Sequence, residues 1–210
     1  MVSVSAPESD FEDAAAVLVL SPRDVGAEAC ADLLARTPGG LDRLLIVAIS
    51  DDPAAWQARL DDRPALDETA VSHVDVRTLR HGDGDDDGPT PVETVRSPAD
   101  LNALGTAIND VLSDAAAAGE RVGLCVYSIS EMLAFVDREL VFKLLHTVGA
   151  RLRREDHVAY FHLDGDTGDE ELETLFSHLS DAVVSIDDNG MTVSPGYYAV
   201  APEDGDLPPE

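Results

Sequence analysis

Basic side chains are scarce in this sequence. Its 210 residues include 14 Lys plus Arg against 42 Asp plus Glu, for a formal net charge of -28, and Lys143 is the only lysine. Binding to nucleic acid or to anionic lipid requires clustered Lys and Arg that release counterions. The composition therefore argues against a nucleic-acid partner and against a membrane partner.

The same imbalance predicts a halophilic protein. Self-repulsion of an acidic surface destabilises the compact state in dilute salt, whereas multimolar salt screens charges within about 3 Å. We expect the fold to melt at a clearly lower temperature in about 0.1 M KCl than in multimolar KCl. Circular dichroism melts in the two buffers check this, and identical melting curves would contradict the halophilic interpretation.

Cysteines and long apolar runs are also few. Cys30 and Cys125 both lie among apolar residues, which excludes a disulfide framework and a CxxC metal site and indicates small core residues. No apolar run approaches the roughly 18 residues of a membrane span, and the first residues lack the basic and apolar regions of a secretory signal. We expect a soluble, cytoplasmic protein.

What the sequence does contain is a series of short apolar runs that alternate with helical patterns. The run from Arg121 to Ser130 is nearly free of charge and predicts a strand buried on both faces, at the centre of a parallel sheet. Asn189-Gly190 predicts a closing hairpin. The fold class is α/β: a doubly wound, mostly parallel sheet with helices on both faces and a C-terminal antiparallel hairpin. Strands are expected at 16–20, 44–49, 71–79, 121–130, 158–163, 182–186 and 191–194, and helices at 25–36, 53–60, 98–118, 131–154 and 169–179.

One domain accounts for most of the chain. We expect it over residues 15–200, with a disordered lead-in at 1–14, an acidic disordered tail at 201–210, a long loop from His81 to Arg96 and a further short edge strand at 197–200. The hydrophobic stripes, including Phe135, Phe142, Phe161 and Phe176, are interpreted as core.

The first strand-to-helix turn is where a phosphate-binding loop lies in a doubly wound sheet. Against the P-loop pattern GxxxxGK followed by Ser or Thr, residues 21–28 align without a gap. Ser21 stands at the first glycine and Gly26 at the second, with Arg23 between them, Ala27 at the lysine and Glu28 at the hydroxyl. The residues that would bind phosphate and magnesium are therefore missing.

The end of the central strand is the second place where nucleotide chemistry is expected. A Walker B carboxylate would hold magnesium there, but Tyr127 occupies that position and is followed by Ser128. Neither side chain is charged at neutral pH. The sequence thus argues against hydrolysis at two independent positions, and we expect no cofactor and no metal ion.

Several segments together resemble the core of RecA/KaiC-type ATPases. They are the central strand with its following helix, residues 157–165, residues 170–186 and the hairpin to Ser194. The resemblance covers roughly residues 16–194 and implies their fold. The hairpin departs from the family pattern, because Met191 to Gly196 contains no Lys or Arg that could reach a neighbour's nucleotide. With the acidic composition, the chain is most similar to haloarchaeal KaiC-like proteins that have lost their nucleotide motifs.

Two further groups of polar residues have a simpler interpretation than a site. Asp83, Asp85 and Asp87 match half of an EF-hand loop, but Glu93 falls one position short of the required acid, so a solvated acidic loop is favoured. His162 lies near Asp164 and Asp166 at a strand end without a third ligand. It is interpreted as a strand-end histidine beside a polar turn rather than a metal or acid/base site.

One basic cluster stands out, formed by Arg151, Arg153 and Arg154 at the end of a long helix. Positive charge there offsets the helix macrodipole, which is the favoured interpretation, and the alternative is a docking patch for an acidic partner.

Three hypotheses follow. The first is a non-catalytic interaction or regulatory module with a protein partner or with self-association. The second is an atypical nucleotide-binding protein or ATPase that recruits Arg23, Ser128 or a neighbour's arginine. The third is a binder of another small ligand at the strand ends.

Overall fold

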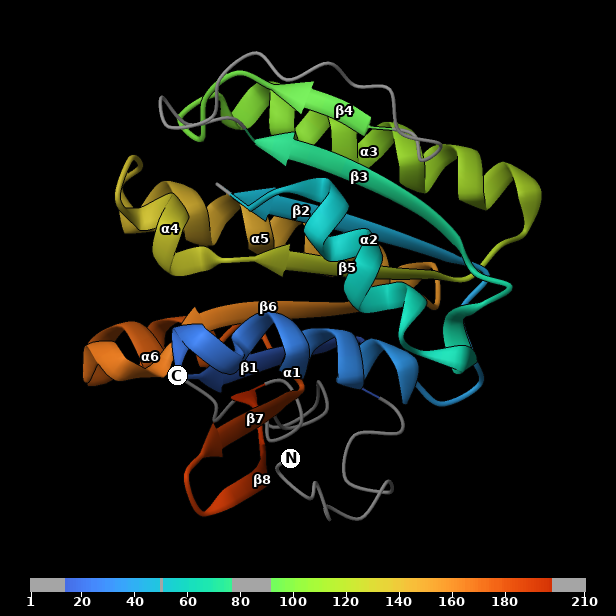
Figure 1. Cartoon of the computed structure of the whole chain (residues 1–210). Helices are drawn as coiled ribbons and strands as arrows, with labels where there is room; N and C mark the ends of the chain where they lie inside the picture. Colours follow the sequence, from blue (N-terminus) through green and yellow to red (C-terminus); the bar gives the residue numbers. More distant parts are fainter. Residues whose placement is uncertain (1–13, 50, 77–91, 198–210) are drawn as a thin grey trace, which may run out of the picture.

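A computed structural model describes residues 14–49, 51–76 and 92–197. Eight strands form one sheet in the order β4-β3-β2-β5-β6-β1-β7-β8, parallel except for the β7–β8 pair (Figure 1). The strands are β1 (Ala16–Ser21), β2 (Arg43–Ile49), β3 (Ala70–Val76), β4 (Val92–Val95), β5 (Val122–Tyr127), β6 (Val158–Asp164), β7 (Ala182–Asp187) and β8 (Gly190–Pro195).

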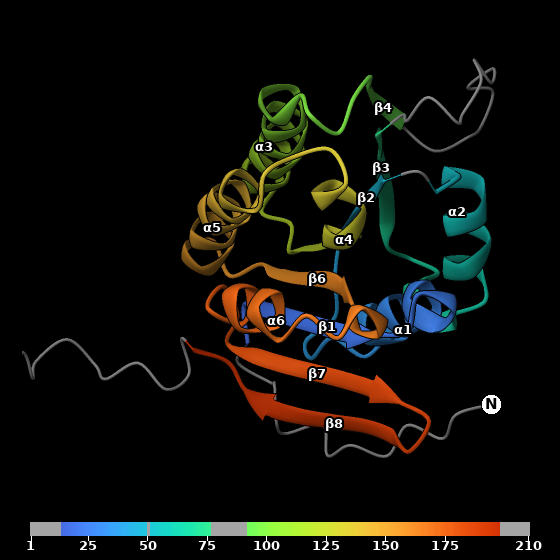
Figure 2. The same cartoon turned by 90° about the vertical axis from the view of Figure 1, so that its left-hand side faces the viewer.

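Helices cover both faces of the sheet (Figure 2). Two apolar clusters lie between the layers: one joins the sheet to α1 and α2, and the other joins it to α3, α4, α5 and α6. The helices are α1 (Arg23–Ala35), α2 (Pro53–Asp61), α3 (Leu101–Ala118), α4 (Ile129–Leu133), α5 (Arg138–Arg154) and α6 (Glu170–Ser177), with short 3-10 turns η2 (Pro64–Leu66) and η3 (Gly165–Thr167).

The predicted fold class is confirmed. β5 is completely buried between β2 and β6, as its uncharged sequence predicts. The predicted hairpin forms, but its turn residues are Asp188 and Asn189, and Gly190 begins β8 with φ +127°. Asp187 accepts a hydrogen bond from the Asn189 amide at 2.7 Å. No helix in the described ranges has both the length and the apolar character needed to cross a bilayer.

The long helix predicted over 131–154 is wrong, because the chain forms two helices there. α4 ends at Leu133 and α5 begins at Arg138, after Asp137 adopts an extended conformation. The carbonyl of Met132 accepts hydrogen bonds from the amides of both Phe135 and Val136, which closes the turn. Phe135 is 51% exposed at this break, so its assignment to the core was also wrong.

The loop predicted from His81 to Arg96 contains a strand at its end. Val92–Val95 pairs with β3 as the edge strand β4. Three of its four residues are β-branched, which favours a strand, but the segment is short and follows a run rich in Gly, Asp and Pro. The following helix begins at Leu101 instead of Pro98, because the Asp100 side chain caps it by accepting from the Ala103 amide at 3.0 Å.

Several other predictions lie outside the described residues. They are the lead-in up to residue 13, the acidic loop with Asp83, Asp85 and Asp87, the edge strand beyond Tyr197, and the C-terminal tail.

Candidate functional site

The carboxyl ends of β1, β6 and β5 lie side by side, with β6 in the middle. In a doubly wound sheet, ligands bind beyond these ends. Three side chains lie at this edge: Ser21 at the end of β1, His162 in β6 and Tyr127 at the end of β5. Tyr127 lines the crevice above the strand ends, whereas Ser21 and His162 are buried.

The turn between β1 and α1 is much shorter than the sequence predicted. α1 begins at Arg23, so Pro22 alone separates strand from helix. Gly26, Ala27 and Glu28 therefore lie in the helix instead of in a loop. A P-loop cradles phosphates with successive backbone N–H groups of an open loop. The β1–α1 junction has no such loop.

His162 fills the space under the first turns of α1. The side chain is 1% exposed, and its Nε2 lies 3.0 Å from the hydroxyl oxygen of Ser21. The contact with α1 is so close that a Cβ added to Gly26 would lie 2.3 Å from this nitrogen. Burial lowers the pKa of His162 to about 4, because an apolar environment disfavours the charged imidazole. His162 is thus a neutral side chain at physiological pH.

Tyr127 closes the crevice on the other side of His162. The two rings lie 4.7 Å apart between centroids, and the ring of Trp56 meets Tyr127 edge-on at 5.3 Å. The Tyr127 hydroxyl donates a hydrogen bond to the backbone carbonyl of Arg23 at 3.1 Å. Burial raises the pKa of the Tyr127 phenol, so this side chain also stays neutral. The position of a Walker B carboxylate therefore holds an aromatic ring that packs on α1.

The two residues that an atypical nucleotide site would recruit already have structural partners. Arg23 forms an ion pair with Glu131, whose side chain is 9% exposed. Ser128 caps α4, because its hydroxyl oxygen accepts a hydrogen bond from the Glu131 amide at 3.3 Å. Using either residue for a nucleotide would require breaking these contacts.

The charge of the crevice is unfavourable for a polyphosphate. A hollow of about 540 Å³ opens above the strand ends. Of its two arginines, Arg23 pairs with Glu131 and Arg59 pairs with Glu28 at 3.0 Å. Four carboxylates line the same hollow, Asp24, Glu28, Asp51 and Asp166.

The basic cluster of α5 is only partly available to a partner. Arg151 pairs with Glu155 at 3.0 Å and bonds to Asn109 of α3, while Arg153 pairs with Asp181 at 3.3 Å. Arg154 is exposed and borders a shallow groove of about 260 Å³ between α3 and α5. Two of the three arginines thus tie α5 to neighbouring elements.

The other polar groups named from the sequence have structural roles at the same edge. Asp164 caps the η3 turn by accepting from the Asp166 amide at 3.0 Å. Across the ranges described, no three His, Cys, Asp or Glu side chains gather as a metal site.

The sheet order, the parallel core and the terminal hairpin define a RecA/KaiC-like α/β fold. The chain belongs to the family of unknown function DUF7504, whose model matches residues 14–186. A search among curated protein sequences found no significant match.

Solved structures from Pyrococcus horikoshii share the fold. The KaiC-like protein PH0186 superposes with a TM-score of 0.54 at 10% identity, covering 94% of this chain and 89% of its own. The uncharacterised protein PH0321, solved in complex with an unknown peptide, superposes with a TM-score of 0.53 at 15% identity. The match covers 86% of this chain and 82% of PH0321. The protein of project PH0250 superposes with a TM-score of 0.54 at 12% identity, and the match covers 87% of this chain and 86% of the other.

Sequence reasoning placed the crevice but missed the residues that fill it. The sequence pattern indicated only a strand-end residue at His162, and it gave no sign that Trp56 packs against Tyr127. A glycine in a helix directly after a buried strand was the available signal, because such a glycine often marks close packing against a bulky neighbour. It does not identify that neighbour.

Proposed function

We propose that this protein is a RecA/KaiC-like domain that does not hydrolyse ATP and acts as an interaction or regulatory module. The observation that carries the proposal is the β1–α1 junction, where the helix starts at Arg23 and His162 occupies the space beneath it. A nucleotide would have to unwind the first turns of α1 and expel a buried ring.

Electrostatics supports the same conclusion. Phosphate sites at helix N-termini combine free N–H groups with nearby positive charge. Here Asp24 lies in the first turn of α1, and the nearest arginine, Arg23, is already paired with Glu131. The alternative of an ATPase built on Arg23 and Ser128 is disfavoured because both side chains hold α4 in place.

A role in binding proteins is supported by the surface and by the comparisons. The structural relative PH0321 was solved with a bound peptide. Exposed apolar side chains, Phe135 at 51% and Leu140 at 50%, lie beside the break between α4 and α5. Arg154 adds an exposed positive charge at the far end of α5. We include in the proposal an acidic partner that docks at this end, and self-association.

Hydrolysis assays test the enzymatic half of the proposal. We expect no phosphate release above the buffer background when the full chain is incubated with ATP and magnesium in multimolar KCl. An Arg23→Ala variant should behave identically. Turnover that the wild type shows and Arg23→Ala loses would establish the atypical ATPase and overturn the proposal.

A further inference from the structure

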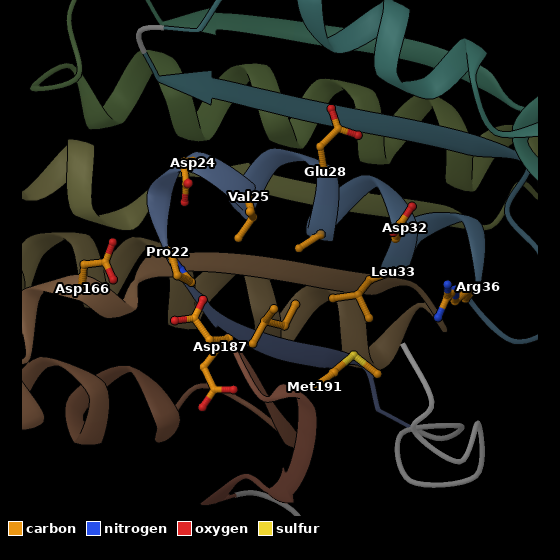
Figure 3. Close-up of a pocket in the computed structure, with 13 residues that line it drawn as sticks. Pro22, Asp24, Val25, Glu28, Asp32, Leu33, Arg36, Asp166, Asp187 and Met191 are labelled. Atoms are coloured by element: carbon orange, nitrogen blue, oxygen red, sulfur yellow. The ribbon is translucent and has the colours of Figure 1, made fainter. Parts of the chain in front are cut away.

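A groove runs between α1 and the β7–β8 hairpin (Figure 3). It adjoins the crevice above the strand ends and shares Asp24, Glu28 and Asp166 with it. Its volume is about 780 Å³. The floor is apolar and comes from three elements: Val25 and Leu33 of α1, Ile186 of β7, and Met191 of β8. Val25 is 37% exposed, whereas Leu33 is only 2% exposed and forms the deep end. The groove therefore offers partly exposed apolar surface at the edge of the sheet.

The rim of this groove is almost entirely acidic. Arg36 is its only cation among the described residues. Two of the carboxylates are satisfied by another arginine, since Glu28 and Asp32 both pair with Arg63 at 2.9 and 2.8 Å. In the part of the chain covered by the structure, the other rim carboxylates form no ion pair. These are Asp24, Asp166, Asp187 and Asp188.

We propose that this groove binds a partner segment in which arginine or lysine side chains flank one or two apolar side chains. Burial of the apolar side chains on Val25, Ile186 and Met191 supplies the affinity, and the rim carboxylates fix the register. The proposal rests on the proposed role as an interaction module and adds the surface and the chemistry of the partner.

The negative charge of the rim favours a basic segment over the other possible occupants of the groove. A second copy of this chain has 14 Lys plus Arg against 42 Asp plus Glu, so it offers few cations that could pair with the rim at contact distance. A nucleic acid or an acidic peptide offers none. A purely apolar segment would leave the rim carboxylates beside low-dielectric surface without partners, which costs free energy.

The test uses a fluorescent peptide in which arginine and leucine alternate, with fluorescence anisotropy as the measurement and the same KCl concentration throughout. We expect saturable binding by the full chain. The double variant Asp166→Lys with Asp188→Lys reverses two exposed rim charges and should weaken binding by about tenfold. Val25→Gln, which removes part of the floor at an exposed position, should weaken it by about fivefold.

A matched control distinguishes binding in the groove from general electrostatic attraction of the basic peptide to an acidic protein. Asp110→Lys with Asp114→Lys makes the same change in net charge on the exposed side of α3, across the sheet from the groove. This pair should change the affinity by less than about twofold. Equal losses in both double variants would overturn the proposal, as would preferential binding of a peptide in which glutamate and leucine alternate.

Val25→Gln separates this result from nucleotide chemistry, because Val25 lines the groove and not the crevice, whereas Asp166 lines both. Light scattering of the same samples completes the test. If the chain proves oligomeric and the rim variants change its mass, the groove binds a second copy and the assignment to a basic segment is wrong.

Discussion

Gly26→Ala should lower the melting temperature by about 5 °C, although alanine is the better helix former. The added Cβ would lie 2.3 Å from His162 Nε2, and it would also meet two ring carbons at 2.9 and 3.0 Å. His162 cannot move aside, because it is held between Ser21 and the ring of Tyr127. Overpacking of this kind costs about 2 to 3 kcal/mol, more than the gain of about 1 kcal/mol in helix propensity.

A second helical glycine provides the matched control. Gly105 lies in α3, and a Cβ there would meet only a methyl carbon of Leu144 at 3.5 Å, which is ordinary contact. Gly105→Ala should therefore stabilise the protein by up to about 1 kcal/mol. If both substitutions behave alike in thermal melts, His162 does not fill the space beneath α1.

A double-mutant cycle locates the clash. In a His162→Ala background, Gly26→Ala should cost at least about 1 kcal/mol less than in the wild type, because the ring that it meets is gone. Additive effects would place the cause elsewhere in α1.

Acidification from pH 6.5 to pH 5 should destabilise the fold by about 1.5 kcal/mol for each of two buried histidines. Burial lowers the pKa of both His73 and His162 to about 4, against about 6.5 in the unfolded chain. In this window the unfolded state takes up a proton that the folded state does not. Stability is therefore complete above pH 6.5 and is lost as the pH falls towards 4.

A substitution at His73 separates the loss of stability caused by histidine protonation from other effects of acid. Both of its ring nitrogens are buried without a hydrogen-bond partner among the described residues. His73→Leu keeps a similar volume and removes one titrating group, so it should clearly reduce the pH dependence between 6.5 and 5. The remaining dependence comes from His162 and from His157, whose pKa burial also lowers. Urea unfolding midpoints at fixed KCl measure this, and an unchanged slope in the variant would contradict the assignment.

The parallel core could be predicted from sequence because each strand carries its own signal. The run before Tyr127 is uncharged since both faces of β5 are buried. The Asn-Gly pair signals the hairpin because Gly190 takes a positive φ directly after the turn at Asp188 and Asn189. The break at Phe135 was not predicted, because the apolar residues around it continue a helical spacing across the turn. Similarly, β4 has only four residues, too few for a clear periodic signal, and it is stabilised by its parallel pairing with β3.

The candidate site was predicted only in part, for a comparable reason. Comparison with the P-loop pattern drew attention to Ser21 and Gly26, and comparison with the Walker B position drew attention to Tyr127. Neither comparison gave a sign that the loop itself is replaced by helix, because that depends on the contact of Gly26 with His162, a residue far away in the sequence. The groove likewise joins α1 to a hairpin at the other end of the chain.

The most direct test of the central claim is calorimetric titration of the wild-type chain with ATP and magnesium in multimolar KCl. The closed β1–α1 junction predicts no saturable heat up to about 1 mM nucleotide, which corresponds to an affinity weaker than about 4 kcal/mol. Saturable binding at micromolar concentrations, weakened by a substitution at Arg23 or Ser128, would contradict it.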